Sequence, residues 1–116
     1  MTGYRPGQIV LVPFPFTDLR TIKKRPALVL ASISSRSFPS LVIAAMITSE
    51  HETEVLVGDY VLTRWQEAGL LYPSKVRLAK LVSLEQQLVV KELGKLHIED
   101  QAGVAQQVKK IFAAWD

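Results

Sequence analysis

Two apolar runs joined by a basic stretch constrain this chain most. Residues 10–16 and 26–33 each have the length and the β-branched and aromatic content of a buried strand. The loop between them, residues 17–25, holds one acid and four basic residues: Asp18, Arg20, Lys23, Lys24 and Arg25. Pro26 suits a strand start because it donates no N–H, and it favours extended backbone at Arg25. We therefore expect Arg25 to stand at the mouth of the sheet; a solvated loop with a charged strand end is the alternative.

Composition limits the chain to one domain and few kinds of site. The 116 residues, 48% of them hydrophobic, predict a single domain over residues 1–116. No apolar run approaches the roughly 18 residues of a membrane span, and the N-terminus has no apolar signal core, so we expect a soluble cytoplasmic protein without membrane contact. Cysteine is absent, and His51 and His97 lack metal-site spacing. We expect no metal and no other cofactor.

Charge is segregated along the sequence although the net charge is only +3. Residues 19–49 contain five basic residues and no acid, and Lys75, Arg77 and Lys80 form a second basic group. The acids gather in residues 50–59 and at residues 99–100. This segregation predicts a positive face that holds phosphates. Ordinary protection of sheet edges by lysine is the alternative.

The remaining pattern predicts more strands and a terminal helix. We expect strands at residues 41–48, 75–82 and 88–96, the second with its basic residues on one side, and a short edge strand at residues 54–57. Gly94 suggests a bulge or close approach, and Gly58–Asp59 a turn.

Two segments have helical signals. Thr63 and Gly69 predict the N-cap and C′ of a short internal helix over residues 63–69. From Ile98 a helical period places four apolar residues on one face of a predicted helix: Val104, Val108, Ile111 and Trp115. Glu99 and Asp100 fall in its first turn, where negative charge is favourable to the helix dipole. The fold class is mainly β with helices, in a compact barrel or curled sheet.

Several common chemistries have no support in the sequence. Phosphate-cradling motifs of the GxxxxGK[ST] and GxGxxG types are absent, as is the GxSxG nucleophile motif. Pairs of carboxylates occur, but Glu99 and Asp100 read as helix-start charge, so a glycosidase has little support.

An arginine and a hydroxyl at strand ends remain. If the second and third strands are antiparallel neighbours, Arg25 and Thr48 meet at one edge of the sheet. A guanidinium with a hydroxyl and nearby amides is a phosphate-binding set, suited to RNA cleavage by the RNA's own 2′-OH. Arg25 would stabilise charge, and Thr48 would position the phosphate. The alternative is that Thr48 and Ser49 merely end a strand, with His51 a solvated turn residue.

Five blocks of sequence resemble the MazF/PemK family of toxins from bacterial toxin–antitoxin systems. The first two are distinctive, and together the blocks run over nearly the whole chain in the family's order: GQIVLVPFPFTDL (residues 7–19), KKRPALVLAS (23–32), AAMITS (44–49), WQEAGLLYPSKVRLAKLVSL (65–84) and LGKL (93–96). The resemblance implies a small curled SH3-like barrel with a C-terminal helix. It also implies a homodimeric, metal-independent, sequence-specific endoribonuclease on single-stranded RNA, leaving 2′,3′-cyclic phosphate and 5′-hydroxyl ends and masked by an antitoxin protein.

The resemblance also assigns residues. The family's catalytic arginine before the proline falls on Arg25, and its catalytic threonine or serine at the end of the third strand falls on Thr48. Arg77 matches an arginine that some members use, whereas Ala79 takes the place of their aspartate, so a carboxylate-assisted route through this strand is not implied. We expect five residues to contact RNA: Thr17, Lys24, Ser49, Lys75 and Arg77. The first loop differs from the glycine-rich loop of some members, so RNA sequence preference is not transferred.

Two other functions stay open. One is a non-enzymatic toxin of the same fold that binds a protein target, as the related CcdB family binds DNA gyrase; that activity needs no arginine before the proline. The other is an RNA-binding module without turnover, whose affinity would depend strongly on salt.

Overall fold

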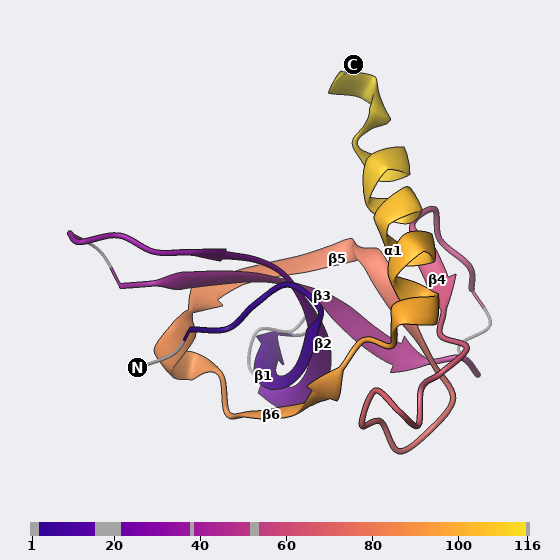
Figure 1. The fold of residues 1–116 in the computed structure, drawn as a ribbon, viewed down its shortest axis with the longest axis horizontal. Coiled ribbons are helices and arrows are strands. Elements are labelled where there is room, and N and C mark those ends of the chain that lie inside the picture. Colours follow the sequence, from indigo (N-terminus) through magenta and orange to yellow (C-terminus); the bar gives the residue numbers. More distant parts are fainter. Residues whose placement is uncertain (1–2, 16–21, 38, 52–53, 116) are drawn as a thin grey trace.

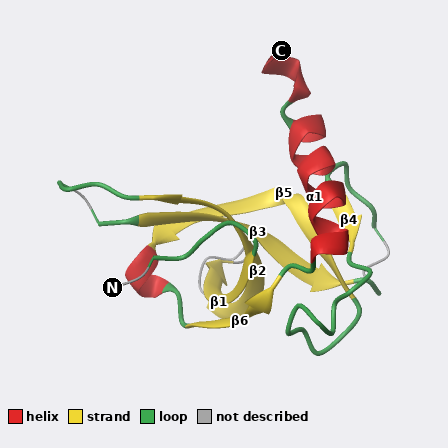
Figure 2. Cartoon of the chain, viewed as in Figure 1, coloured by secondary structure: helices red, strands yellow, loops and turns green. Residues whose placement is uncertain are grey.

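The computed structural model describes residues 3–15, 22–37, 39–51 and 54–115 (Figure 1). The sheet comprises β1 (Gln8–Pro15), β2 (Ile22–Ile33), β3 (Leu41–Ser49), β4 (Asp59–Val61), β5 (Ser74–Glu85) and β6 (Lys91–Lys95). The helices are η1 (Gln86–Leu88), α1 (Ile98–Ile111) and η2 (Ala113–Trp115), of which η1 and η2 are short 3-10 turns (Figure 2). None of the described helices has the length and apolar character needed to cross a membrane.

The strands form one antiparallel sheet in the order β4-β5-β3-β2-β1-β6. Figure 1 shows this sheet strongly curled, with α1 standing beside β4 and β5. Within the described residues no pairing joins the edge strands β4 and β6, so the sheet is not closed. The expected fold class, mainly β with a C-terminal helix, is confirmed, whereas a closed barrel is not. The reason is geometric: β4 and β6 lie at opposite ends of the strand order, and β4 has only three residues with which to pair.

Each face of the sheet has its own core, because successive strand residues point to opposite faces. One face packs against α1 and the segment after β4, with Leu28, Ile47 and Leu78 fully buried; its buried residues form the outer core. The other face, the inner face, buries mainly small and β-branched side chains: Val10, Val12, Phe14, Ala27, Val29, Val42, Ala44, Met46, Leu84 and Val89. The buried part of the inner face is therefore apolar and built mostly of small side chains.

The basic stretch before Pro26 belongs largely to a strand. β2 begins at Ile22, and its ladder with β1 runs from Ile9–Leu28 to Pro15–Ile22. The expectation that residues 17–25 form a loop is therefore wrong for residues 22–25. Pairing with β1 extends the strand past the proline, since each β1 residue in that run already has a partner on β2. Arg25 consequently lies within β2 and not at its start.

Other expected boundaries also change. Residues 54–57 are not a strand; after the turn at Gly58, whose φ is +95°, β4 begins at Asp59. The helix expected over residues 63–69 is wrong, because residues 65–69 form hydrogen-bonded turns. Among the described residues, the short helix between two strands is η1, which lies between β5 and β6. Thr63 does not cap a helix, because its N–H and hydroxyl both donate to Asp100.

The prediction for Gly94 is confirmed, whereas that for Gly69 is wrong. Gly69 has a φ of +88°, but it ends a run of hydrogen-bonded turns and no helix, so it is not a C′ residue. The β1–β6 register shifts between Ile9 and Val10, opposite Gly94, so a bulge lies where Gly94 predicted one. A Cβ on Gly94 would stand 2.3 Å from the carbonyl oxygen of Ala68, so close approach requires glycine there as well.

The terminal helix is confirmed, but its apolar face is shorter than predicted. His97 caps it, its Nδ1 accepting a 3.1 Å hydrogen bond from the Glu99 N–H. Val104 is buried and Ile111 packs on the outer core, whereas Trp115 is 88% exposed. Trp115 lies in η2, after the helix has ended and risen away from the sheet (Figure 1).

Candidate active site

Antiparallel pairing aligns residues of five strands in two adjacent rows at one end of the inner face. Each row is read from the strand registers, and residues paired across strands share a face. The lower row is complete in the observed pairs: Val10, Ala27, Met46, Arg77 and Asp59. The upper row comes from three of those ladders: Val12–Arg25, Thr48–Lys75 and Lys75–Val61. The two rows bring the predicted catalytic residues onto a single surface.

Arg25 and Thr48 are the central members of the upper row. The β2–β3 ladder includes Val29–Ala44, Leu28–Ala45 and Ala27–Met46, and Arg25 and Thr48 lie two residues beyond the last of these pairs. Because side chains alternate along each strand, both lie on the face of Ala27 and Met46. Both side chains are half-buried, so they line a surface that solvent and ligand reach. The two residues share a face, whereas their convergence at one edge of the sheet stays a prediction, since the observed β2–β3 pairs end at Ala27–Met46.

A buried ion-pair cluster closes one end of this surface. The Arg77 Nε and Nη2 atoms each lie 3.0 Å from a carboxylate oxygen of Asp59, and the Lys75 Nζ lies 3.6 Å from Asp59 Oδ2. Residue exposures of 3% for Lys75 and 5% for Arg77 place both in the interior. Burial alone would raise the pKa of the Asp59 carboxyl, but the Arg77 guanidinium, the Leu56 N–H and the Lys75 charge hold that pKa below its ordinary value. The Asp59 carboxyl is therefore ionised at neutral pH.

This cluster changes the expectation for β5. Its basic residues were predicted to lie on a solvated side of a half-buried strand, yet residues 74–78 are all buried. Lys75 and Arg77 share the face of Arg25 and Thr48, and their side chains contact Asp59. Lys75 belongs to the upper row and Arg77 to the lower row.

The other predicted RNA contacts do not share this face. Lys24 pairs with Pro13 and Ser49 pairs with Ser74, so alternation turns both side chains to the face opposite Arg25 and Thr48. The Ser49 Oγ accepts a 3.1 Å hydrogen bond from the His51 N–H, and His51 is exposed in that turn, as expected. Thr17 lies outside the described residues.

One basic residue that the sequence reasoning passed over does share the site face. Lys23 pairs with Phe14, two positions from Arg25 on β2, and is exposed. Strand alternation from Arg25 is the signal that would have identified Lys23 in place of Lys24. Residues 17–25 were expected to form a loop, in which side chains do not alternate between two faces.

Comparison with known families decides what kind of protein this is. Residues 5–112 match the family described as PemK-like, MazF-like toxin of type II toxin–antitoxin system. The chain belongs to this toxin family. A comparison with curated protein sequences finds no match.

Solved structures of similar fold agree with this assignment. One is the Mycobacterium tuberculosis toxin MazF-mt6, with a TM-score of 0.70 and 22% sequence identity over 94% of this chain and 97% of the other. Another is a crystal structure of MazE-MazF from Deinococcus radiodurans, with a TM-score of 0.63 and 19% identity over 97% of each chain. At these identities the likeness establishes that the toxin has the MazF fold.

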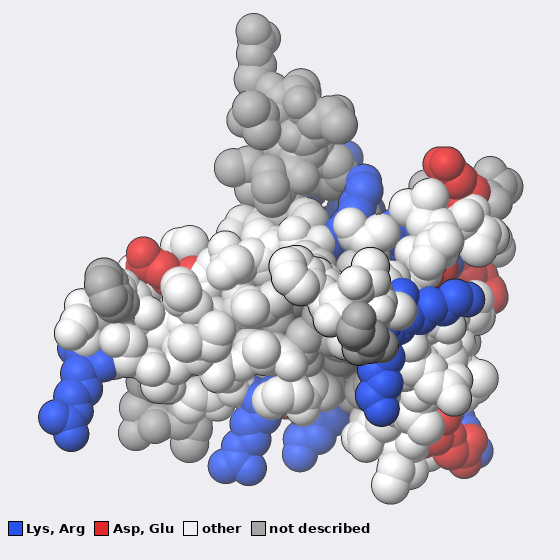
Figure 3. Space-filling model, turned by 90° about the horizontal axis from the view of Figure 1, so that it is seen from above, with Lys and Arg blue, Asp and Glu red and all other residues white. Residues whose placement is uncertain are grey.

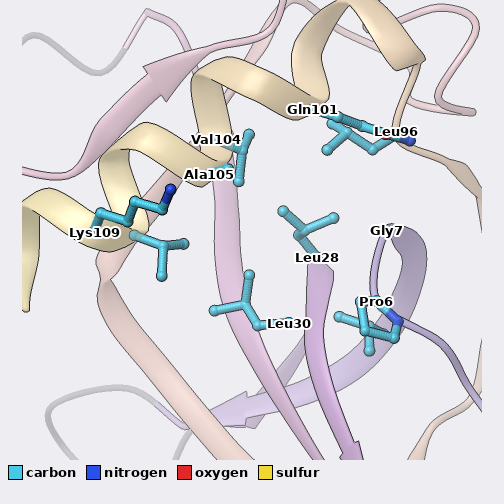
Figure 4. A pocket seen from close by; sticks show the side chains of 11 residues that line it. Pro6, Gly7, Leu28, Leu30, Leu96, Gln101, Val104, Ala105 and Lys109 are labelled. Carbon is cyan, nitrogen blue, oxygen red and sulfur yellow. The ribbon is translucent and has the colours of Figure 1, made fainter.

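An apolar groove of this toxin lies away from the two rows. It has a volume of about 400 Å³ and runs between α1 and β2, with Leu28 and Leu30 on one side and Val104 and Ala105 on the other (Figure 4). Leu28 belongs to the outer core, so the groove opens on the face opposite Arg25. The groove is therefore separate from the candidate chemistry.

Charge on the toxin surface gathers at margins. In Figure 3, Lys and Arg side chains project along one long margin and one end of the molecule, while Asp and Glu lie toward the two ends. Uncharged side chains fill the middle of this view. The predicted charge segregation is thus visible on this view as a basic margin more than as one continuous basic face.

Proposed function

We propose that this toxin is an endoribonuclease that cleaves single-stranded RNA at the surface formed by Arg25 and Thr48. The observation that carries this proposal is strand alternation: counted from the Ala27–Met46 pair, Arg25 and Thr48 lie on one face, and both are half-buried. Family membership supports the same reading, since both residues fall within the family match. A guanidinium and a hydroxyl on one face suit the binding of a phosphodiester.

The proposed reaction is attack by the 2′-oxygen of the RNA on the adjacent phosphorus. The new bond joins the 2′-oxygen to phosphorus, and the bond from phosphorus to the 5′-oxygen breaks. The 2′-hydroxyl loses a proton and the leaving 5′-oxygen gains one, which gives a 2′,3′-cyclic phosphate and a 5′-hydroxyl. Arg25 stabilises the charge that builds on the phosphoryl oxygens, and Thr48 holds the phosphate in line.

The other basic residues have supporting roles in this proposal. Lys75 and Arg77 add positive potential beneath the phosphate from the buried end of the rows. Lys24, Ser49 and Thr17 make secondary RNA contacts, the first two from the opposite face. The toxin acts as a homodimer in the cytoplasm, and a cognate antitoxin protein inhibits it.

The test is cleavage of a defined single-stranded RNA by the purified toxin in excess EDTA. We expect discrete products with cyclic phosphate and 5′-hydroxyl ends, identified by end labelling. Arg25→Ala should lower the rate by about 10²–10³-fold, as expected for loss of one charge-stabilising donor. Arg36→Ala is the matched control, because Arg36 is exposed in the turn at the far end of β2 and β3.

Three other results would each redirect the proposal. Full activity of Arg25→Ala would overturn the site. No cleavage by the parent together with tight gyrase binding would favour the non-enzymatic toxin. Salt-dependent RNA binding without any product would favour an RNA-binding module.

A further inference from the structure

Asp59 is the only acid among the residues of the two rows. It opens β4 and pairs with Arg77 of β5, so its side chain points along the inner face toward the site. Its carboxylate accepts two hydrogen bonds from Arg77, at 3.0 Å each, and lies 3.6 Å from the Lys75 ammonium. Only 3% of its side chain is exposed. Asp59 thus orients two buried cations at once.

The same carboxylate fixes the chain that precedes β4. Its Oδ2 accepts a 2.9 Å hydrogen bond from the Leu56 N–H, and the Asp59 N–H donates to the Leu56 carbonyl at 3.0 Å. Both cations also donate to the carbonyl oxygen of Glu54, Arg77 at 2.8 Å and Lys75 at 3.1 Å. Residues 54–56 are irregular backbone, so these bonds replace the ladder that a strand would have supplied.

This arrangement adjoins the reacting residues directly. Lys75 is the β5 partner of Thr48, and Arg77 is the β5 partner of Met46 in the row below. A shift in either cation therefore moves the charge and the packing beneath the Thr48 hydroxyl. Residues 54–57 form the rim beyond Lys75, and the backbone bonds set where their exposed Val55 and Val57 side chains stand.

We propose that Asp59 is a positioning residue of the RNA-cleaving site, which holds Lys75, Arg77 and the 54–56 backbone in register with Thr48. The proposal rests on the ribonuclease function proposed above. Asp59 does not contact the phosphate; it acts through the two cations.

Asp59→Asn is the decisive variant, because it keeps the size and one oxygen while removing the charge that orients the cations. Asp100→Asn is the matched control. Asp100 is equally buried and ionised, and it contacts the neighbouring β4 residue Tyr60, but it bonds to the segment after β4 and not to the two rows. Both variants lose stability, so comparing them separates positioning from folding.

The measurements are steady-state kcat and KM for one RNA, at a temperature where circular dichroism shows every variant fully folded, and amide hydrogen exchange of residues 54–58. We expect Asp59→Asn to lower kcat by about tenfold or more with KM within about threefold, since small misplacements at a reacting centre cost up to about 10²-fold. Exchange at Leu56 should rise in this variant. Asp100→Asn should retain the parent kcat and the parent exchange at Leu56.

The outcomes are distinguishable. A parent that does not cleave RNA overturns the ribonuclease function and the positioning role that depends on it. A parent that cleaves, with Asp59→Asn retaining its kcat, overturns the positioning role alone. An equal kcat loss in Asp59→Asn and Asp100→Asn also overturns it, because the effect would then follow stability.

Discussion

The Tyr60 hydroxyl donates a 2.8 Å hydrogen bond to Asp100 Oδ1, which joins β4 to the first turn of α1. Asp100 is 0% exposed and accepts three further bonds, from the Thr63 N–H and hydroxyl and from the Arg64 N–H. Burial raises the pKa of Tyr60 to about 12, with help from this carboxylate. The same donors, opposing the effect of burial, hold the pKa of Asp100 below its ordinary value. One side chain therefore secures the helix to the edge of the sheet.

Asp100→Ala should destabilise the toxin by on the order of 3 kcal/mol, because it leaves several buried donors without an acceptor. Chemical denaturation monitored by circular dichroism measures this. Glu99→Ala is the control: Glu99 is the neighbouring acid, and its bridge to Arg64 is exposed, so the expected loss is at most about 1 kcal/mol. Equal losses in the two variants would show that the buried network contributes little.

Stability should fall in acid because of Asp59 and Asp100. Their pKa values are depressed in the folded state, so the unfolded chain binds more protons as pH drops below the ordinary aspartate value of about 4. The stabilisation is fully present above that value and is lost as pH falls through the folded pKa values. Urea denaturation between about pH 7 and about pH 3 tests this. Asp100→Asn should show a shallower decline, and an unchanged decline would contradict the assignment.

Gly94→Ala should destabilise the protein by about 3 kcal/mol or more, because the new Cβ would stand 2.3 Å from the Ala68 carbonyl oxygen. Backbone must move to admit it. Gly3→Ala is a matched control: its Cβ would meet the end of the flexible Gln86 side chain at 3.2 Å, so we expect a change within about 0.5 kcal/mol. Thermal denaturation compares the two variants. Parent-like stability of Gly94→Ala would show that the segments around Gly94 and Ala68 move apart at little cost.

Lys23→Ala should weaken RNA binding more than Lys24→Ala, because Lys23 shares the face of Arg25 and Lys24 does not. The measurement is binding of a 2′-O-methyl RNA oligonucleotide, which cannot supply the attacking hydroxyl. For Lys23→Ala we expect an affinity loss of about threefold to tenfold and a salt slope reduced by about 0.7. A larger effect of Lys24→Ala would mean that RNA crosses the opposite face.

Local sequence determined much of this protein. The apolar runs predicted β1, β2 and β3, Gly94 predicted a bulge, and the period after Ile98 predicted α1. These predictions succeed because hydrophobic period and glycine conformation act within a few residues of the chain. The residues Arg25 and Thr48 were also identified from strand ends and from the family resemblance.

Tertiary structure alone decided how those residues are supported. Asp59 read as part of a turn and Asp100 as helix-start charge, yet each is a buried acceptor whose partners lie 18 residues away for Arg77 and 37 for Thr63. The burial of Lys75 and the separation of Lys23 from Lys24 depend likewise on which strands pair and in what register. Register is a contact between distant segments, and a buried charge is tolerated only where folding supplies its partner, so no local pattern in the sequence contains either one.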